Sequence, residues 1–193
     1  MWRQRGKRRV GRERAALEEE RAALEERCGG LVGDAVTSVA YVEMEYDEPM
    51  WNLTEDYDSV DHGVELRLSS GRMVALLWDH AIVDFGMRMV EGNVTVIEGV
   101  PRLDVSTTSR WSSLIGRTIT RCRVLWKPDE DDDYIDCLPQ TIRLDFEGGR
   151  RVFVTASDVD RDFSWGADHV SVFFDDAWER RSDLTHDIHP SLD

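Results

Sequence analysis

Apolar and polar residues alternate along two stretches of the chain, VELRLSSGRMVALL (residues 64–77) and TIRLDFEGGRRVFV (residues 141–154). Alternation with a period of two predicts β-strands that bury one face. Each stretch has a glycine near its middle, Gly71 or Gly149, where a short hairpin needs a residue with a left-handed backbone. Both stretches are therefore predicted to be β-hairpins.

The similarity extends to both sides of the hairpins, in the same order along the chain. The matched residues are Leu31-Val32-Gly33 with Leu114-Ile115-Gly116, Val36 with Ile119, Val39 with Cys122, Val64, Leu66 and Leu68 with Ile142, Leu144 and Phe146, Val74 and Leu76 with Val152 and Val154, and Asn93–Val96 with His169–Val172. Matches in one order indicate an internal duplication, with repeats at 31–98 and 114–174. Their predicted strands are residues 35–46, 63–69, 72–78 and 93–98, and residues 117–126, 140–146, 150–156 and 169–174.

A four-strand unit with one apolar face needs a second layer to cover that face, and two such units can cover each other. We therefore expect a mainly β (α+β) domain over residues 31–184, in which the two repeats form a sandwich or a barrel-like body. A short C-terminal helix is expected at residues 175–184, and residues 185–193 are expected to form a loose tail.

The first 30 residues differ from the rest. Residues 1–12 hold six Arg and Lys and no acid, and the heptad ERAALEE occurs twice in residues 13–26. These are strong helix formers, and Gly29 and Gly30 are expected to end the helix. Because the apolar stripe is thin, residues 1–30 are predicted to be a basic tip and a charged helical arm that adds little to the core. Weak self-association through this helix is the alternative.

The formal net charge of the chain is −15. An acidic protein repels phosphate backbones and anionic membranes, so neither specific nucleic-acid binding nor membrane binding is expected. No apolar run reaches the ~18 residues of a transmembrane helix, and the start lacks the apolar stretch of a secretory signal. The three cysteines form no C-x-x-C pair, which fits a reducing compartment, so a cytoplasmic protein is expected.

Two long connections, one in each repeat, combine acids with aromatic residues. Aromatic side chains supply contact area and acids select a cationic partner, so these connections are predicted to bind a basic protein. The candidate residues are Asp47, Glu48, Trp51, Glu55, Asp56, Tyr57, Asp58, Asp129, Glu130, Asp131, Asp132, Asp133 and Tyr134. Alternatively, the aromatic residues fold back onto the core and the acids only keep the loops solvated.

The patterns for metal binding and catalysis are weak. Asp129, Asp131 and Asp133 alternate as in a calcium loop, but the glycine and the closing Glu of an EF-hand are missing. His62, His80 and His169 each follow an Asp, but adjacency in sequence supplies neither a nucleophile nor a pocket. No catalytic residue, metal ligand or cofactor is therefore predicted.

Together these features predict a non-catalytic acidic binding module that masks a basic surface of a partner protein, as an immunity or inhibitor protein does. A structural or assembly component held through its N-terminal helix is the first alternative. An enzyme whose site has no sequence signature is the second.

Overall fold

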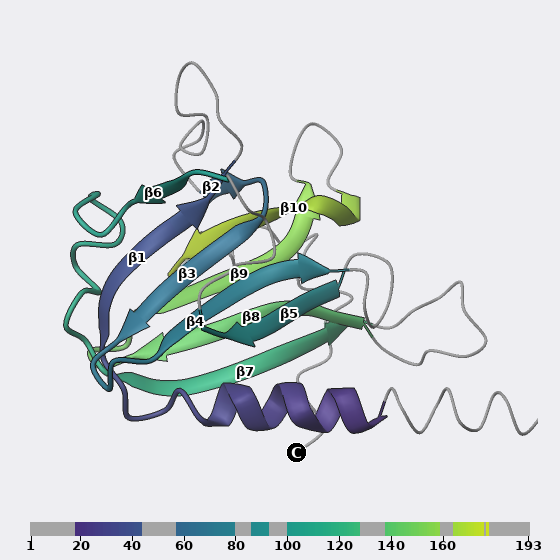
Figure 1. Cartoon of the computed structure of the whole chain (residues 1–193), viewed down its shortest axis with the longest axis horizontal. Coiled ribbons are helices and arrows are strands. Elements are labelled where there is room, and N and C mark those ends of the chain that lie inside the picture. The colour runs from purple at the N-terminus through teal and green to yellow at the C-terminus, as the bar shows by residue number, and fades with distance from the viewer. Residues whose placement is uncertain are drawn as a thin grey trace, which may run out of the picture.

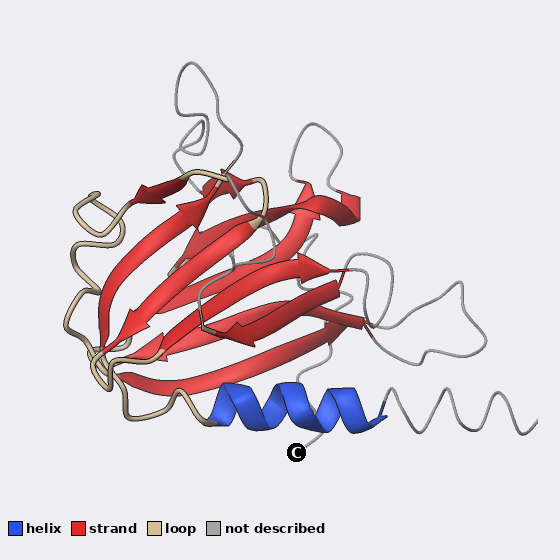
Figure 2. Cartoon of the chain, in the orientation of Figure 1, coloured by secondary structure: helices blue, strands red, loops and turns tan. Residues whose placement is uncertain are grey.

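The computed structural model describes residues 18–43, 57–79, 86–92, 100–127, 138–158, 164–175 and 177. This part of the chain is mainly β, with two five-stranded antiparallel sheets and one helix over residues 18–29 (Figure 1, Figure 2). No helix in it is long and apolar enough to cross a bilayer. Most of the C-terminal helix and all of the tail predicted from the sequence lie outside the described residues.

The first sheet consists of β5 (Gly86–Glu91), β4 (Met73–Asp79), β3 (Gly63–Leu68), β1 (Val36–Val42) and β6 (Arg102–Asp104), in this order. The second sheet consists of β2 (Tyr57–Val60), β10 (Ser164–Phe174), β9 (Arg151–Asp158), β8 (Leu138–Phe146) and β7 (Ile119–Lys127). Each sheet therefore contains four strands that pair in chain order, β1-β3-β4-β5 and β7-β8-β9-β10. The described strands leave edges on both sheets and do not close into a barrel.

The two four-strand series share their registers, and the ladders β1–β3 and β7–β8 both shift just after their first pair. The corresponding pairs are Val36–Leu68 with Ile119–Phe146, Val39–Leu66 with Cys122–Leu144, Leu66–Val74 with Leu144–Val152, and Leu76–Met89 with Val154–Val172. The strand that pairs with β4 is β5, earlier in the chain than the predicted strand at 93–98, and residues 93–98 lie outside the described part. The match of Asn93–Val96 to β10 is therefore wrong. Common descent of the two series stays a prediction.

The two sheets meet where β1 and β7 begin, at an isolated antiparallel bridge between Ala35 and Thr118. Backbone hydrogen bonds surround this bridge in two corresponding pairs. They are Gly33 N–H to Ile119 O (2.9 Å) with Gly116 N–H to Val36 O (2.7 Å), and Ile119 N–H to Asp34 O (2.8 Å) with Val36 N–H to Arg117 O (3.3 Å). Gly33 and Gly116 both have a left-handed backbone, with φ of 94° and 82°, which a residue with a Cβ rarely adopts.

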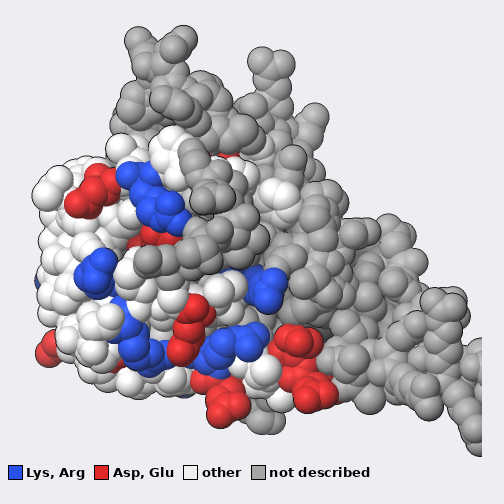
Figure 3. Space-filling model, in the orientation of Figure 1, with Lys and Arg blue, Asp and Glu red and all other residues white. Residues whose placement is uncertain are grey.

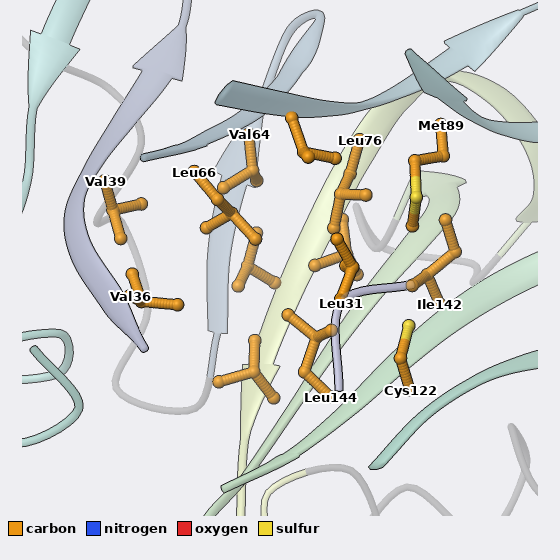
Figure 4. Packing of buried hydrophobic residues seen from close by; sticks show 14 of the residues in the cluster. Leu31, Val36, Val39, Val64, Leu66, Leu76, Met89, Cys122, Ile142 and Leu144 are labelled. Atoms are coloured by element: carbon orange, nitrogen blue, oxygen red, sulfur yellow. The ribbon is translucent and has the colours of Figure 1, made fainter. Parts of the chain in front are cut away.

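Side chains of both sheets share one core (Figure 4). Figure 4 shows Leu76 and Met89 of the first sheet on one side and Ile142 and Leu144 of the second on the other, with Leu31 between them. These residues are buried, and their alternation in β4, β5 and β8 is the period-two pattern that the sequence shows. Burial of such side chains is the main force that stabilises a fold of this kind.

The N-terminal helix lies along β7 (Figure 1) and supplies Leu24 and Cys28 to the core, with exposed fractions of 0% and 1%. The Trp126 indole N–H of β7 donates to Glu25 Oε1 at 3.1 Å, and the Arg21 guanidinium lies 4.7 Å from the centre of the Trp126 ring. The prediction that this segment adds little to the core is therefore wrong for the described part of the helix. One leucine per heptad is enough, because the helix packs along β7 and buries only a narrow stripe of its surface.

Candidate functional site

Eleven of the thirteen predicted partner-binding residues lie outside the described part of the chain. They are Asp47, Glu48, Trp51, Glu55, Asp56, Asp129, Glu130, Asp131, Asp132, Asp133 and Tyr134. The other two, Tyr57 and Asp58, belong to β2 and are buried, with exposed fractions of 8% and 0%. The sequence interpretation placed both residues in a surface connection, whereas β2 pairs with β10 and the Tyr57 ring packs against Phe173 at 5.2 Å between centroids.

The two acid-rich segments, residues 44–56 and 128–137, follow corresponding strands along the chain. β1 and β7 both start beside the Ala35–Thr118 bridge and diverge from it (Figure 1), so residues 44–56 and 128–137 begin at the far ends of these strands. The two segments together contain eleven Asp and Glu and no Lys or Arg. On the described surface, by contrast, acids and cations are interspersed, as Figure 3 shows for one face. The uneven charge of the chain therefore comes largely from these segments.

Asp58 belongs to a buried hydrogen-bonded network between the sheets. The Tyr41 hydroxyl donates to Asp58 Oδ2 at 2.6 Å and accepts from the Trp111 indole N–H at 2.7 Å, while the Arg110 guanidinium pairs with Asp58 Oδ1. Burial raises the pKa of Asp58, although the hydrogen bonds from Tyr41 and Arg110 act in the opposite direction. Burial and the neighbouring Asp58 also raise the pKa of Tyr41. Both carboxylate oxygens have donors, so the network joins β1, β2 and the 106–116 turn.

Glu65 of β3 is a second buried carboxylate with a cationic partner. Its exposed fraction is 4%, and the Arg102 Nε of β6 lies 3.1 Å and 3.0 Å from its two carboxylate oxygens. Because β6 also pairs with β1, this ion pair ties the short edge strand to the next strand but one. A buried charge of this kind is tolerated when a guanidinium and hydrogen bonds replace the lost water.

Glu43 and Asp61 form a pair of carboxyl groups at the end of β1. Glu43 follows β1, Asp61 lies in the turn between β2 and β3, and their exposed fractions are 6% and 5%. Glu43 Oε1 is buried, and no residue in the described part of the chain donates to it. Burial raises the pKa of Glu43 to about 8, and the hydrogen bond with the Asp61 side chain contributes in the same direction. This carboxyl group therefore keeps its proton near neutral pH.

Two histidines and one tryptophan surround Asp61. His169 Nε2 of β10 lies 3.5 Å from Asp61 Oδ1, and the Trp78 indole N–H donates to the Asp61 backbone oxygen at 2.7 Å. The His62 ring stacks on Trp78 at 6.5 Å between centroids, and burial lowers the pKa of His62. Each Asp-His pair by itself indicates no site in the sequence. The structure brings His62 and His169 to the same carboxylate, and His80 lies outside the described residues.

A close contact between strands β3 and β4 fixes this turn. A Cβ on Gly63 would lie 2.2 Å from the Leu76 backbone oxygen, so only glycine fits directly after Asp61 and His62. The sequence signal for the site was the run Asp61-His62-Gly63, in which a glycine forces a polar turn close to the sheet. Glu43 had no such signal, because its place beside Asp61 depends on the pairing of β1 with β3.

The arrangement can hold and release a proton. No group of three or more His, Cys, Asp or Glu among the described residues has the geometry of a metal site. The alternating residues Asp129, Asp131 and Asp133 lie outside that part, so calcium binding there stays untested.

No protein-family model, curated protein or solved structure matches the chain.

Proposed function

We propose that the protein is a non-catalytic binding module that covers a basic surface of a partner protein, in the manner of an immunity or inhibitor protein. The observation that carries this proposal is the departure of two acid-rich segments, residues 44–56 and 128–137, from corresponding ends of β1 and β7. Eleven acids in two places act on one side of a partner more strongly than acids spread over the whole surface, because their fields add.

We also propose that the two four-strand series descend from one duplicated unit and pack as a sandwich. The matched registers and the paired hydrogen bonds around Ala35 and Thr118 support this origin. A duplicated scaffold explains why the chain carries two acid-rich segments in corresponding places. The shared core then fixes the distance between the strand ends, which lowers the entropy lost when both segments bind one partner.

An assembly role through the N-terminal helix has less support. Leu24 is one of the two leucines that would form a helix-pairing stripe, and it is buried in the protein's own core. The outward face of the described helix is formed by charged residues and alanine, which provide little apolar area for a second chain.

The test compares association with a partner captured from the native cell. The triple variant Asp131→Asn, Asp132→Asn, Asp133→Asn should slow association about tenfold at low ionic strength and flatten its dependence on salt, because charges outside the contact mainly steer the encounter. Trp51→Ala should mainly speed dissociation, because buried aromatic anchors set residence time. The matched control is Glu18→Gln, Glu19→Gln, Glu20→Gln, which removes three exposed acids from the helix.

Surface plasmon resonance at about 0.05 M and 0.5 M salt separates the two rates. The proposed function would be excluded if partner binding did not change with salt concentration, in the triple Asn variant or in Trp51→Ala. Equal effects of the helix control and the triple Asn variant would show that only net charge matters, which would also exclude it.

A further inference from the structure

Two of the three cysteines meet in the core. Cys28 lies in the last turn of the N-terminal helix and Cys122 lies in β7, and their exposed fractions are 1% and 9%. The two thiols share a hydrogen bond, so their sulfur atoms are in contact, yet both cysteines are free. The third cysteine, Cys137, lies outside the described residues. The fold therefore brings together two thiols that are separated in sequence by the six strands β1 to β6.

The corresponding positions of the other half show that the core does not require sulfur at these two places. Val39 of β1 holds the place of Cys122, and Trp111 holds that of Cys28, five residues before a glycine with a left-handed backbone. Both Val39 and Trp111 are buried. The core is thus closed in both halves, but only the contact between the helix and β7 carries two groups that can be joined covalently.

We propose that Cys28 and Cys122 form a reversible disulfide site, which fastens the N-terminal helix to β7 under oxidising conditions. In the reduced protein the helix is held by noncovalent contacts, such as the burial of Leu24 and the hydrogen bond between Trp126 and Glu25. The disulfide would enclose β1 to β6 in one loop. A crosslink across so long a segment restricts the unfolded chain strongly, so oxidation should stabilise the fold as well as fix the helix.

A small-molecule disulfide such as oxidised glutathione would supply the oxidant. The hydrogen bond with Cys28, together with burial and the negative charge of Asp145, raises the pKa of the Cys122 thiol, so Cys122 keeps its proton and donates to the Cys28 sulfur. Cys28 therefore reacts first: it gives its proton to water, attacks one sulfur of the small disulfide and expels one thiolate. This thiolate takes up the Cys122 proton, and Cys122 then attacks Cys28 Sγ and expels the second thiolate, which is protonated by water. Two protein thiols are oxidised, and one small disulfide is reduced to two thiols.

Burial of both thiols makes this reaction slow in the folded protein. The small disulfide reaches Cys28 only when the helix lifts from β7, because buried cysteines are inert. Such local opening costs less than global unfolding, since the described helix supplies only Leu24 and Cys28 to the core. Oxidation is therefore expected over minutes to hours, and the completed bond would keep the helix in its docked position.

The experiment incubates the folded full-length protein with oxidised and reduced glutathione in several ratios and then blocks the remaining thiols with N-ethylmaleimide in urea. Trypsin places Cys28, Cys122 and Cys137 in three different peptides, because arginines lie between them in the chain. Mass spectrometry of the unreduced digest therefore identifies the pairing. The link between Cys28 and Cys122 should accumulate in the oxidising mixtures, and the Tm should rise by about 10 °C. Dithiothreitol should reverse both changes.

Cys122→Val is the matched control, because it places at this position the residue that β1 carries at Val39. This variant and Cys28→Ala should fold but should gain no stability from oxidation. Cys137→Ser should respond to oxidation as the unsubstituted protein does. The site would be overturned if Cys28 and Cys122 both stayed fully labelled after a day in the most oxidising mixture, or if either of them paired with Cys137 instead. An equal rise in Tm in Cys122→Val and Cys28→Ala would also overturn it.

Discussion

The ends of β1 and β7 occupy corresponding places in the two sheets but carry different chemistry. Glu43 is the seventh residue after Val36, and Trp126 is the seventh after Ile119. Trp126 has partners within the chain, since its indole N–H donates to Glu25 and the Arg21 guanidinium covers its ring. Glu43 keeps an oxygen without a donor in the described structure. The two halves therefore differ in how the chain satisfies the side chain at the end of the first strand of each series.

At a second pair of corresponding positions, the two halves carry side chains of different size. Cys28 and Trp111 each lie five residues before a left-handed glycine, Gly33 or Gly116, and each closes one side of the core. Cys28 meets Cys122, and their hydrogen bond together with burial raises the pKa of the Cys122 thiol. Trp111 instead donates to the Tyr41 hydroxyl and packs edge-on against Phe174 at 5.2 Å between centroids. One side is closed by small groups, and the other by an indole with a polar network.

The largest loss of stability is expected from a charge placed in the shared core, and it tests whether both halves depend equally on that core. Val74→Asp and Val152→Asp each place a charge at a fully buried position that pairs with Leu66 or Leu144. Each should cost more than about 4 kcal/mol in the free energy of unfolding, because a buried charge without a partner is strongly unfavourable. Chemical denaturation measures both.

Val32→Asp is the control for this pair, since Val32 is 48% exposed and should change stability by less than about 0.5 kcal/mol. If either Val74→Asp or Val152→Asp left the free energy of unfolding nearly unchanged, the shared core would be contradicted.

A smaller loss of stability is expected when Trp111 or Cys28, the residues that close the two sides of the core, is shortened. Trp111→Ala should cost about 3–5 kcal/mol, because it opens a cavity and removes the donor to Tyr41. Cys28→Ala removes a single sulfur atom and should cost on the order of 1 kcal/mol. Thermal and urea unfolding of both variants give the difference. Equal costs would mean that the two sides are closed in the same way.

The last effect concerns pH and the contrast between Glu43 and Trp126. An unfolded Glu has a pKa near 4.5, whereas folding raises that of Glu43 to about 8. Between these values the folded protein holds a proton that the unfolded chain has lost, so stability falls as pH rises and levels off above about 8. Glu43→Gln should remove this fall, and the gap between the two curves should grow to a few kcal/mol, since each unit of pKa difference corresponds to about 1.4 kcal/mol. Parallel curves from pH 4.5 to 8 would show that Glu43 ionises normally.

The hairpins were predictable because their information is local. The alternation in residues 64–77 and 141–154 and the turn glycines Gly71 and Gly149 identify β3, β4, β8 and β9 without any long-range contact. The fourth strand of the first half was misplaced because Val94 and Val96 fit the alternation as well as Met87 and Met89 do. Only pairing with β4 decides between them.

The missed features depend on contacts between distant parts of the chain. Asp58 of β2 is typical of a loop in sequence. It can be buried in a strand because Tyr41 and Arg110 bind its carboxylate. Leu24 looked too isolated to dock a helix, because the sequence does not show that β7 lies beside this segment. Glu43 has no signal in the sequence, and only the pairing of β1 with β3 brings it beside Asp61.

The pairing of β2, from the first half of the chain, with β10, from the second half, has a consequence for protein synthesis. β2 precedes β3 in the chain yet completes the second sheet by pairing with β10. At typical rates of translation, β10 leaves the ribosome on the order of ten seconds after β1. Until then the nascent chain exposes the apolar faces of β3 and β4, as well as a β2 strand without its neighbour. A chain released early, before β10, would carry this unpaired surface permanently and would be a target for chaperones and proteases.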